Sequence, residues 1–202
     1  MTKPIIIEEH PFPFFPSNKA KWLFIGTFPP EKRRWAIEFF YPNFYGNDMW
    51  NIFGKIFFQD KNHFVDILKN TTKEKTKEAI EELLRKEHIA MHNVAKKIVR
   101  LKGNASDKNL EIKEWINIEE TIRELPDLQY IVATGGRALK EIVGLLSKGE
   151  VGKIKSPKIG EYVSFTFENR DLRLYRMPST SKNYTLALDK KVGAYKKMFD
   201  EV

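Results

Sequence analysis

The stretch Lys21-Trp-Leu-Phe-Ile-Gly-Thr-Phe-Pro-Pro30 gives the clearest indication of the fold. Its apolar run over residues 21–27 predicts a buried strand, which Gly26 and the pair Pro29-Pro30 bring to an end. A glycine followed by two prolines fixes a rigid turn with a bare backbone, which a ligand could approach closely. An ordinary exit from a strand into a loop has the same composition, so both interpretations stay open.

Strands and helices alternate along the rest of the chain. Strands are predicted over 88–94 and 129–134, with a hairpin over 162–167 and 172–177. Helices are predicted over 47–58, 72–86 and 138–146, in a segment marked by Trp115, Ile118 and Ile122 that ends before Pro126, and in a C-terminal segment striped by Leu188, Val192, Tyr195 and Phe199. We expect loops over 103–109 and 147–160. This alternation predicts an α/β protein, a three-layer α/β/α sandwich with a mainly parallel central sheet, formed by one domain over residues 1–202.

Unusual polar residues follow the predicted strands. They are Gly26–Pro30, Asn93, Gly135-Gly136 and Met177–Ser181. Ligands of open α/β sheets bind at the carboxyl ends of the strands. We therefore expect a site where these four segments meet at one edge of the sheet.

The composition limits the classes of function. The chain is 42% hydrophobic with 15 Phe, which suffices for a sizeable core. The formal net charge of +8, from 35 basic and 27 acidic residues, favours polyanionic partners without demonstrating one. No apolar run approaches the roughly 18 residues of a membrane span, and the N-terminus has too short an apolar stretch for a secretory signal. We expect a cytoplasmic protein that contacts no membrane, and a monomer.

The cysteine and histidine content of the sequence gives little support for metal or redox chemistry. The absence of cysteine excludes disulfides, cysteine-ligated zinc, iron–sulfur clusters and a cysteine nucleophile. The chain has four histidines, His10, His63, His88 and His92. His88 and His92 are four residues apart, but their run predicts a strand rather than a metal-binding helix. We expect no metal and no cofactor.

The second polar segment, Phe40-Tyr-Pro-Asn-Phe-Tyr-Gly-Asn-Asp-Met-Trp50, places aromatic residues and two asparagines before a helix start. Aromatic faces can stack on an unpaired base, each contributing roughly 1–3 kcal/mol. The N–H groups of a helix start favour an anion or an oriented water. The alternative makes the aromatic side chains part of the core and Asn47 a helix cap.

The third segment, Met177-Pro-Ser-Thr-Ser181, has three hydroxyl groups in a row behind a proline. Hydroxyl and backbone N–H groups at a turn can hold a DNA phosphate without base specificity. A cap for the final helix is the alternative, and both roles can hold together. Gly135-Gly-Arg137 suggests a phosphate loop but lacks the established spacings, so packing at a strand-to-helix turn is favoured.

Taken in order, G-T-F-P-P, F-Y-P-N-x-x-x-N-D-M-W and M-P-S-T-S-x-N resemble the uracil-DNA glycosylase superfamily. The nearest match is with its mismatch-specific and hypoxanthine-type branches, where a G-x-x-P-G loop, an N-x-F-W helix start and an L-P-S-T-S loop occupy these places. The resemblance spans roughly residues 20–200. Met91–Val94 through Arg100 and Ser106-Asp107 also resemble that branch's strand and basic loop.

The resemblance implies base excision on double-stranded DNA. Such an enzyme flips a damaged nucleotide into a pocket, and water attacks C1′ as the N-glycosidic bond breaks. Asn47 matches the catalytic asparagine of the hypoxanthine-type branch, which implies that it positions the water. Asp48 would be a general base or, as we prefer, a first-turn carboxylate favoured by the helix dipole. Uracil and hypoxanthine both leave with negative charge, so donors aimed at the base matter more than a strong base.

The resemblance also implies how DNA and the base are held. Asn93 falls near the superfamily's base-reading position, and an amide offers a donor and an acceptor to the edge of uracil. The related branch tends to have Asp there, which leaves the substrate open. Phe28, Phe44 and Tyr45 are candidates to stack on the flipped base. Pro178, Ser179, Thr180 and Ser181 match the loop that pinches the DNA backbone, and Tyr184 or Leu186 would fill the vacated stack.

The chain departs from the superfamily at two positions. Phe28 stands where several branches place Asp or Asn, and Met177 stands where others have His. Our first hypothesis is a monofunctional DNA glycosylase acting on a deaminated base. The alternative is a non-catalytic nucleic-acid-binding protein with the glycosylase fold, and a third is an unrelated α/β enzyme that binds a phosphate-bearing ligand at Gly135-Gly136.

Overall fold

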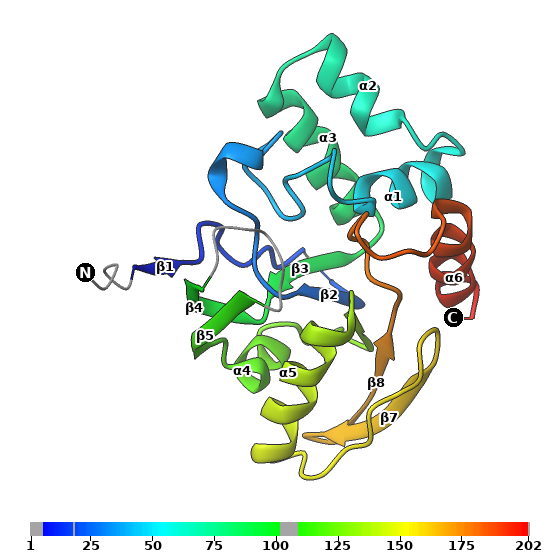
Figure 1. The fold of residues 1–202 in the computed structure, drawn as a ribbon. Helices are drawn as coiled ribbons and strands as arrows, with labels where there is room; N and C mark the ends of the chain where they lie inside the picture. Colours follow the sequence, from blue (N-terminus) through cyan, green and yellow to red (C-terminus); the bar gives the residue numbers. More distant parts are fainter. Residues whose placement is uncertain (1–5, 18, 102–108, 202) are drawn as a thin grey trace.

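The computed structural model describes residues 6–17, 19–101 and 109–201. These residues form a five-stranded sheet, a separate three-stranded sheet and six α-helices (Figure 1). The mixed α/β class predicted from the sequence is confirmed. Ser106, Asp107 and most of the predicted loop 103–109 lie outside the described residues.

The larger sheet contains all the predicted strands. Its order is β3-β2-β6-β8-β7, with bounds Ile89–Asn93, Trp22–Gly26, Tyr130–Ala133, Arg170–Arg176 and Tyr162–Phe167. The first four strands are parallel to their neighbours, and β7 pairs antiparallel with β8 as the predicted hairpin. The sheet is therefore mainly parallel, as predicted.

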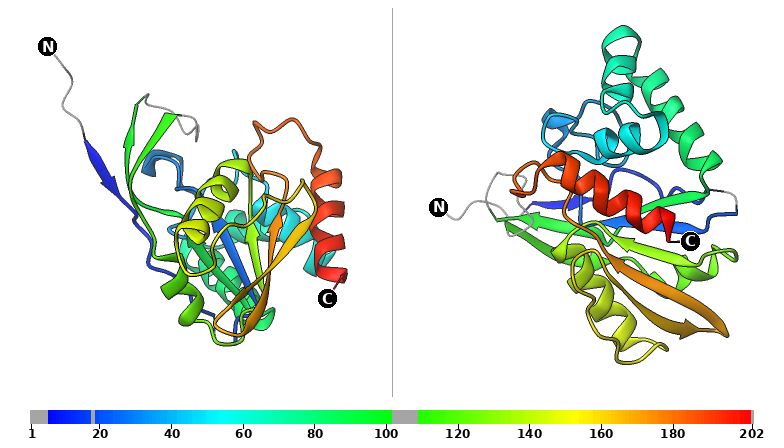
Figure 2. Two further views of the ribbon diagram at one scale, coloured as in Figure 1. Left: turned by 90° about the horizontal axis from the view of Figure 1, so that it is seen from below. Right: turned by 90° about the vertical axis from the view of Figure 1, so that its right-hand side faces the viewer.

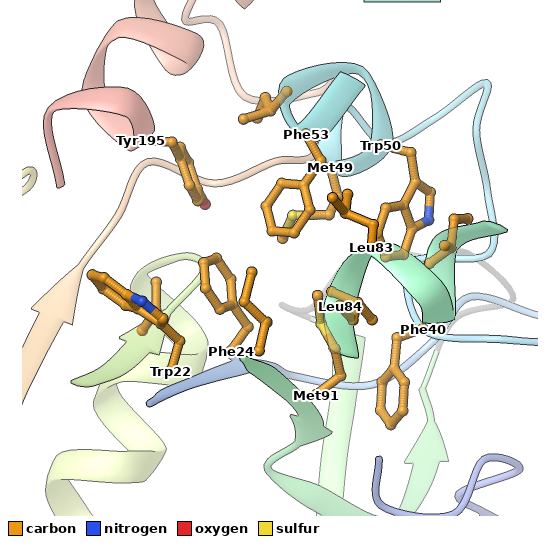
Figure 3. Close-up of a cluster of buried hydrophobic side chains, with 14 of the residues drawn as sticks. Trp22, Phe24, Phe40, Met49, Trp50, Phe53, Leu83, Leu84, Met91 and Tyr195 are labelled. Atoms are coloured by element: carbon orange, nitrogen blue, oxygen red, sulfur yellow. The ribbon is translucent and has the colours of Figure 1, made fainter. Parts of the chain in front are cut away.

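The side chains of β2 alternate between two hydrophobic clusters. Trp22 and Phe24 pack in one cluster with residues of α1 (Met49–Phe58), α3 (Lys73–Lys86) and α6 (Leu188–Asp200), shown in Figure 3. Leu23 and Ile25 pack in the other cluster with α4 (Ile118–Arg123) and α5 (Gly136–Lys148). Because successive side chains of a strand point to opposite faces, β2 is buried from both sides. This explains its uninterrupted apolar sequence.

The helices begin where local capping allows. Thr72 Oγ1 accepts from Lys75 N (3.2 Å) before α3, and Asn117 Oδ1 accepts from Glu120 N (3.2 Å) before α4. The predicted helix therefore begins at Ile118. The prediction that Trp115 belongs to it was wrong, because Trp115 is the last residue of strand β5. Helix α2 (His63–Asn70) was not predicted.

The smaller sheet was also not predicted. Its order is β1-β4-β5, with bounds Ile7–Glu9, Ala95–Arg100 and Leu110–Trp115, and its pairs are antiparallel. The sequence indicated only a basic segment there. Its small core consists of Ala95, Ile98, Leu110 and Ile112, with Phe28 packed against it.

The carboxyl ends of the parallel strands lie at one edge of the larger sheet. Gly26 is paired with Asn93, Ile25 with Ala133, and Ala133 with Arg176. The prediction that these strand ends meet at one edge is confirmed. In the left view of Figure 2, the β4–β5 hairpin and the segment between β8 and α6 project on the same side of the molecule.

Candidate functional site

Polar side chains gather where β2 and β3 end. A Cβ atom added at Gly26 would lie 2.7 Å from Asn93 Nδ2 and 3.2 Å from the Tyr41 hydroxyl oxygen. The Tyr41 hydroxyl lies 2.8 Å from Thr134 Oγ1, which donates to the Ile25 carbonyl (3.2 Å). Glycine at position 26 therefore allows an amide and a phenol to approach the strand end closely.

Asn93 is 7% exposed and is held by a residue that the sequence analysis did not select. Its Oδ1 lies 3.0 Å from His10 Nε2, while His10 Nδ1 lies 2.7 Å from the Phe12 carbonyl oxygen. Burial lowers the pKa of His10 below its usual 6.5, against the opposing effect of its hydrogen bonds to Asn93 and Phe12. Asn93 thus has a fixed neighbour on one side of its amide.

The segment after β8 docks on the start of α1. Asn47 and Ser181 form an isolated antiparallel bridge, and Asp48 N donates to the Thr180 carbonyl (2.7 Å). Lys182 N donates in turn to the Gly46 carbonyl (3.0 Å). Two of the three predicted motifs are therefore joined by backbone hydrogen bonds.

Asn47 turns its side chain toward the helix start. Its Oδ1 accepts from Met49 N (2.9 Å), although the formal N-cap position is Asp48, whose side chain makes no capping bond. The predicted capping residue thus contacts the first helical N–H from one position earlier. A carbonyl oxygen has two lone pairs, so Asn47 Oδ1 keeps a second acceptor direction.

Asp48 forms a buried ion pair rather than an open carboxylate. Its Oδ2 lies 2.7 Å from Lys191 Nζ, and that ammonium group also donates to the Ser181 carbonyl (2.9 Å). The lysine side chain is 1% exposed and the aspartate side chain 9%. An ion pair this buried needs each partner to compensate the other. Asp48 therefore links α1, the 178–182 segment and α6.

The same segment is anchored at its other end. Pro178 is buried, and its carbonyl oxygen accepts from the Tyr195 hydroxyl (2.9 Å). Ser179 lies beside Gly135, whose φ of 142° favours glycine, and a Cβ there would lie 3.5 Å from Ser179 Cβ. Ser179 Oγ accepts from Ser181 N (3.3 Å). Of the three adjacent hydroxyl residues, Thr180 is buried, while Ser179 and Ser181 are half-buried.

The three aromatic candidates for base stacking occupy different environments. Phe44 is 4% exposed and packs in the core cluster, whereas Tyr45 is 80% exposed. Phe28 is half-buried, with its ring centroid 5.3 Å from that of His10 and 5.7 Å from the guanidinium carbon of Arg100. The structure brings Phe28 close to the Asn93 environment through His10. It places Phe44 inside the core, where stacking on a base would require it to move.

Arg100 of the predicted basic segment turns inward. It donates from Nε to Glu8 Oε1 (2.8 Å) and from Nη2 to the Pro29 carbonyl (2.8 Å). Its side chain is 7% exposed. Through these hydrogen bonds, Arg100 connects the loop after β2 to the smaller sheet.

The proposed wedge residues lie in the segment before α6. Tyr184 is 36% exposed and its backbone N donates to the Ser181 carbonyl (3.1 Å). Leu186 is half-buried. Lys182, Asn183 and Thr185 beside them are exposed, so this segment presents a surface of polar and aromatic side chains.

Two hollows on the described surface lie away from this edge. One, of about 530 Å³, is lined by residues that precede the parallel strands, including Lys21, His88 and Gln129. The other, of about 260 Å³, lies between Trp35 and the start of α3. The candidate site is therefore defined by converging polar groups and not by either of these hollows.

Two features are absent from the described ranges. Within 6–17, 19–101 and 109–201, no group of three or more His, Asp or Glu side chains is arranged to hold a metal ion. No helix in this part of the chain is long and apolar enough to cross a membrane.

Sequence analysis missed the partners of the predicted residues. His10, Thr134 and Lys191 stand outside the three motifs, and Tyr41 was noted only as one of several aromatics. Their positions carry no recognisable spacing, because each meets the site through a contact distant in sequence. The Pro- and Phe-rich run around His10 was the one available signal.

The fold resembles that of a protein of known structure. A solution NMR structure of a protein from Methanosarcina acetivorans, named as a putative uracil DNA glycosylase, superposes with a TM-score of 0.59. The two sequences are 17% identical, and the similarity covers 96% of this chain and 99% of that chain. No family model matches the sequence, and no curated protein does. The comparison supports the fold predicted from the motifs and leaves the chemistry to the site itself.

Proposed function

We propose that this chain is a monofunctional DNA glycosylase, which hydrolyses the N-glycosidic bond of a flipped uracil or hypoxanthine in double-stranded DNA. The observation that carries the proposal is the meeting of the three motifs at the carboxyl edge of the sheet. Asn93 lies beside Gly26, Ser179 beside Gly135, and Asn47 is bridged to Ser181. Such an edge is where open α/β sheets bind ligands.

We assign to Asn47 the role of positioning the attacking water. Its Oδ1 is held by Met49 N and can accept a hydrogen bond from the water with its remaining lone pair. The sugar becomes oxocarbenium-like as the base leaves as an anion, so an oriented neutral water suffices as nucleophile, and after attack on C1′ its proton passes to solvent. The start of α1 adds a positive dipole end, which favours the developing negative charge on the base.

Asn93 is the group we assign to base recognition. It is held in place by His10, and Gly26 provides room on the Nδ2 side. An amide nitrogen placed there can donate to a carbonyl oxygen of uracil or hypoxanthine, where negative charge builds up on departure. Phe28 is the best placed of the three aromatic candidates to contact the base.

We assign to the 178–182 segment the role of binding the DNA backbone. Its carbonyl groups at positions 178, 180 and 181 are bonded within the protein. The hydroxyl oxygens of the half-buried Ser179 and Ser181 accept from Ser181 N (3.3 Å) and Asn183 N (3.2 Å), which leaves their O–H groups as donors. Donors fixed in this way can bind phosphate without base specificity. The net charge of +8 adds a favourable electrostatic contribution.

The helices on the two sides of the larger sheet support a finer assignment of the architecture. We assign it to the three-layer α/β/α sandwich, because α1, α3 and α6 share one hydrophobic cluster with the sheet while α4 and α5 share the other.

The test is a strand-incision assay after alkali treatment. Duplexes carrying uracil, hypoxanthine or xanthine are incubated with the protein, and we expect an abasic product from at least one of them. Binding to the same duplexes is measured over a range of salt concentrations. Salt-sensitive binding with no abasic product from any duplex would contradict the proposal and favour the non-catalytic nucleic-acid-binding alternative, which the presence of Phe28 and Met177 motivates.

A further inference from the structure

We propose that His10 is a positioning residue that determines which end of the Asn93 amide faces a bound base. This inference rests on the proposed function, because it concerns the same site. It adds a determinant of base selectivity supplied by the segment after β1, outside all three sequence motifs.

The ring of His10 is fixed from several directions. Its backbone N donates to the Lys96 carbonyl (2.8 Å), and its ring centroid lies 5.3 Å from that of Phe28 and 5.9 Å from that of Phe40. Both ring nitrogens also have polar neighbours: Nδ1 lies 2.7 Å from the Phe12 carbonyl oxygen and accepts from Phe12 N (3.3 Å), and Nε2 lies 3.0 Å from Asn93 Oδ1. Among the described residues, His10 is the one side chain hydrogen-bonded to the Asn93 amide.

The protonation of this ring is coupled to the orientation of the amide. When Nε2 carries a proton it donates to Asn93 Oδ1, and the Asn93 NH₂ group is left for another partner. A neutral ring with its proton on Nδ1 has a lone pair on Nε2, which would instead hold the NH₂ group and turn the carbonyl outward. Phe12 N donates to Nδ1 (3.3 Å), so Nδ1 has a lone pair and the single proton of the neutral ring lies on Nε2, which is the first arrangement.

The surroundings of Asn93 make this choice consequential. A Cβ atom at position 26 would lie 2.7 Å from Asn93 Nδ2. Because residue 26 is glycine, it has no side chain to cover that nitrogen. An outward NH₂ group pairs with a carbonyl oxygen, as in uracil or hypoxanthine. An outward carbonyl pairs with an amino group, as in cytosine or adenine. His10 therefore biases Asn93 toward the deaminated base and against the normal one.

The experiment compares three full-length variants. His10→Phe keeps a ring against Phe28 and Phe40 but removes the hydrogen bond, and His10→Gln supplies an amide donor in its place. His92→Phe is the matched control, because His92 is equally enclosed and its ring centroid lies 6.5 Å from that of His10, with no hydrogen bond to Asn93 among the described contacts. All are compared with wild type and with Asn93→Ala.

The readout is selectivity in binding. Otherwise identical duplexes carry 2′-fluoro-deoxyuridine or 2′-fluoro-deoxycytidine, in which the fluorine slows hydrolysis so that binding is measured without turnover. We expect His10→Phe to lower the ratio of the two affinities about tenfold, the effect of losing one hydrogen bond. His10→Gln should restore most of the ratio, and His92→Phe should leave it unchanged.

Two further measurements decide the mechanism. His10→Phe should have no added effect in the Asn93→Ala background, and it should shift the Asn93 side-chain amide signals in a ¹H–¹⁵N spectrum of the free protein. An unchanged affinity ratio, an equal loss in the Asn93→Ala background, or unmoved amide signals would each overturn the role of His10. Absence of turnover on every lesion would count against the proposed function alone, since neither the binding ratio nor the spectrum depends on hydrolysis.

Discussion

Asn47 and Asn93 give the candidate site two neutral amides where an acid or a base might have been expected. A departing uracil or hypoxanthine anion needs donors more than a strong base, and amides supply donors at every pH. Each amide is held by one specific partner, Met49 N for Asn47 and His10 for Asn93. Orientation, rather than charge, is therefore the property that these two residues contribute.

Replacing Asn47 by Ala should lower the single-turnover rate of base release about 100-fold, because the water loses its acceptor. Affinity for the substrate duplex should change little, since Asn47 acts on the water and not on the DNA backbone. Asn43→Ala is the matched control, as Asn43 Oδ1 accepts from Gly46 N (3.0 Å) in the same loop. Full activity in Asn47→Ala would remove Asn47 from the catalytic role.

At the residue scale, the sequence predicted the motif residues but not their partners. Asn47, Asn93 and Ser179 could be selected because each stands next to a strand or helix end with a recognisable local pattern. His10 and Lys191 could not, because a lone histidine in a loop and a lysine in a charged helix have no local pattern that indicates burial. Their roles arise from contacts that depend on the complete fold.

At the scale of elements, the buried pair of Asp48 and Lys191 connects parts of the chain that are far apart in sequence. Lys191 belongs to α6, Asp48 precedes α1, and the Ser181 carbonyl accepts from the same ammonium group. The pair fixes the 178–182 segment against Asn47. A substitution in this pair would therefore disturb the candidate site and the stability of the fold together.

Lys191→Met should lower the free energy of unfolding by about 3–5 kcal/mol, because it removes the buried cation 2.7 Å from the Asp48 carboxylate and leaves only the exposed Lys182, 3.8 Å away. Combining it with Asp48→Asn should recover part of the loss, since the uncompensated charge is then removed. Lys196→Met is the control on the same helix, where an exposed pair with Asp200 (2.7 Å) should contribute less than about 1 kcal/mol. Urea unfolding of the wild type and the three variants measures this, and equal losses for the Lys191 and Lys196 variants would refute the assignment.

The strands of the larger sheet were predictable and those of the smaller sheet were not. β2, β3 and β6 are wholly or largely buried, so their apolar runs are unmistakable. β4 (AKKIVR) has two adjacent charged residues and two adjacent apolar ones, and β5 (LEIKEW) alternates over only its first four residues. Neither gives a clear period of two, and the lysines of β4 resemble a basic loop. β1 has three residues and is recognisable only through its pairing with β4.

At the scale of the whole molecule, the segment after β1 covers His92 on the edge strand of the larger sheet. The His92 ring stacks on Phe14 with centroids 5.0 Å apart, and its buried Nδ1 has no hydrogen-bond partner among the described residues. Burial, with the nearby charges of His10 and Lys96, lowers the pKa of His92 from 6.5 to about 4. The packing of this segment on β3 therefore depends on a neutral imidazole.

This dependence predicts how stability changes with pH. Between about pH 4 and 6.5 the unfolded chain binds a proton at His92 that the folded chain does not. The free energy of unfolding should therefore fall as the pH is lowered through this window, by up to about 3 kcal/mol from this group. Above pH 6.5 the contribution is fully present. Carboxylates also titrate in acid, so the informative quantity is the difference between wild type and His92→Phe.

That difference should be constant from pH 7 to 8, where it reflects packing against Phe14 alone. Below pH 6.5 the wild type should lose stability faster than His92→Phe, because phenylalanine cannot take up a proton. Denaturant unfolding at half-unit steps of pH measures both curves. Parallel curves down to pH 4 would show that His92 accepts a proton in the folded state at its ordinary pKa, and hence that the segment after β1 does not exclude water from β3.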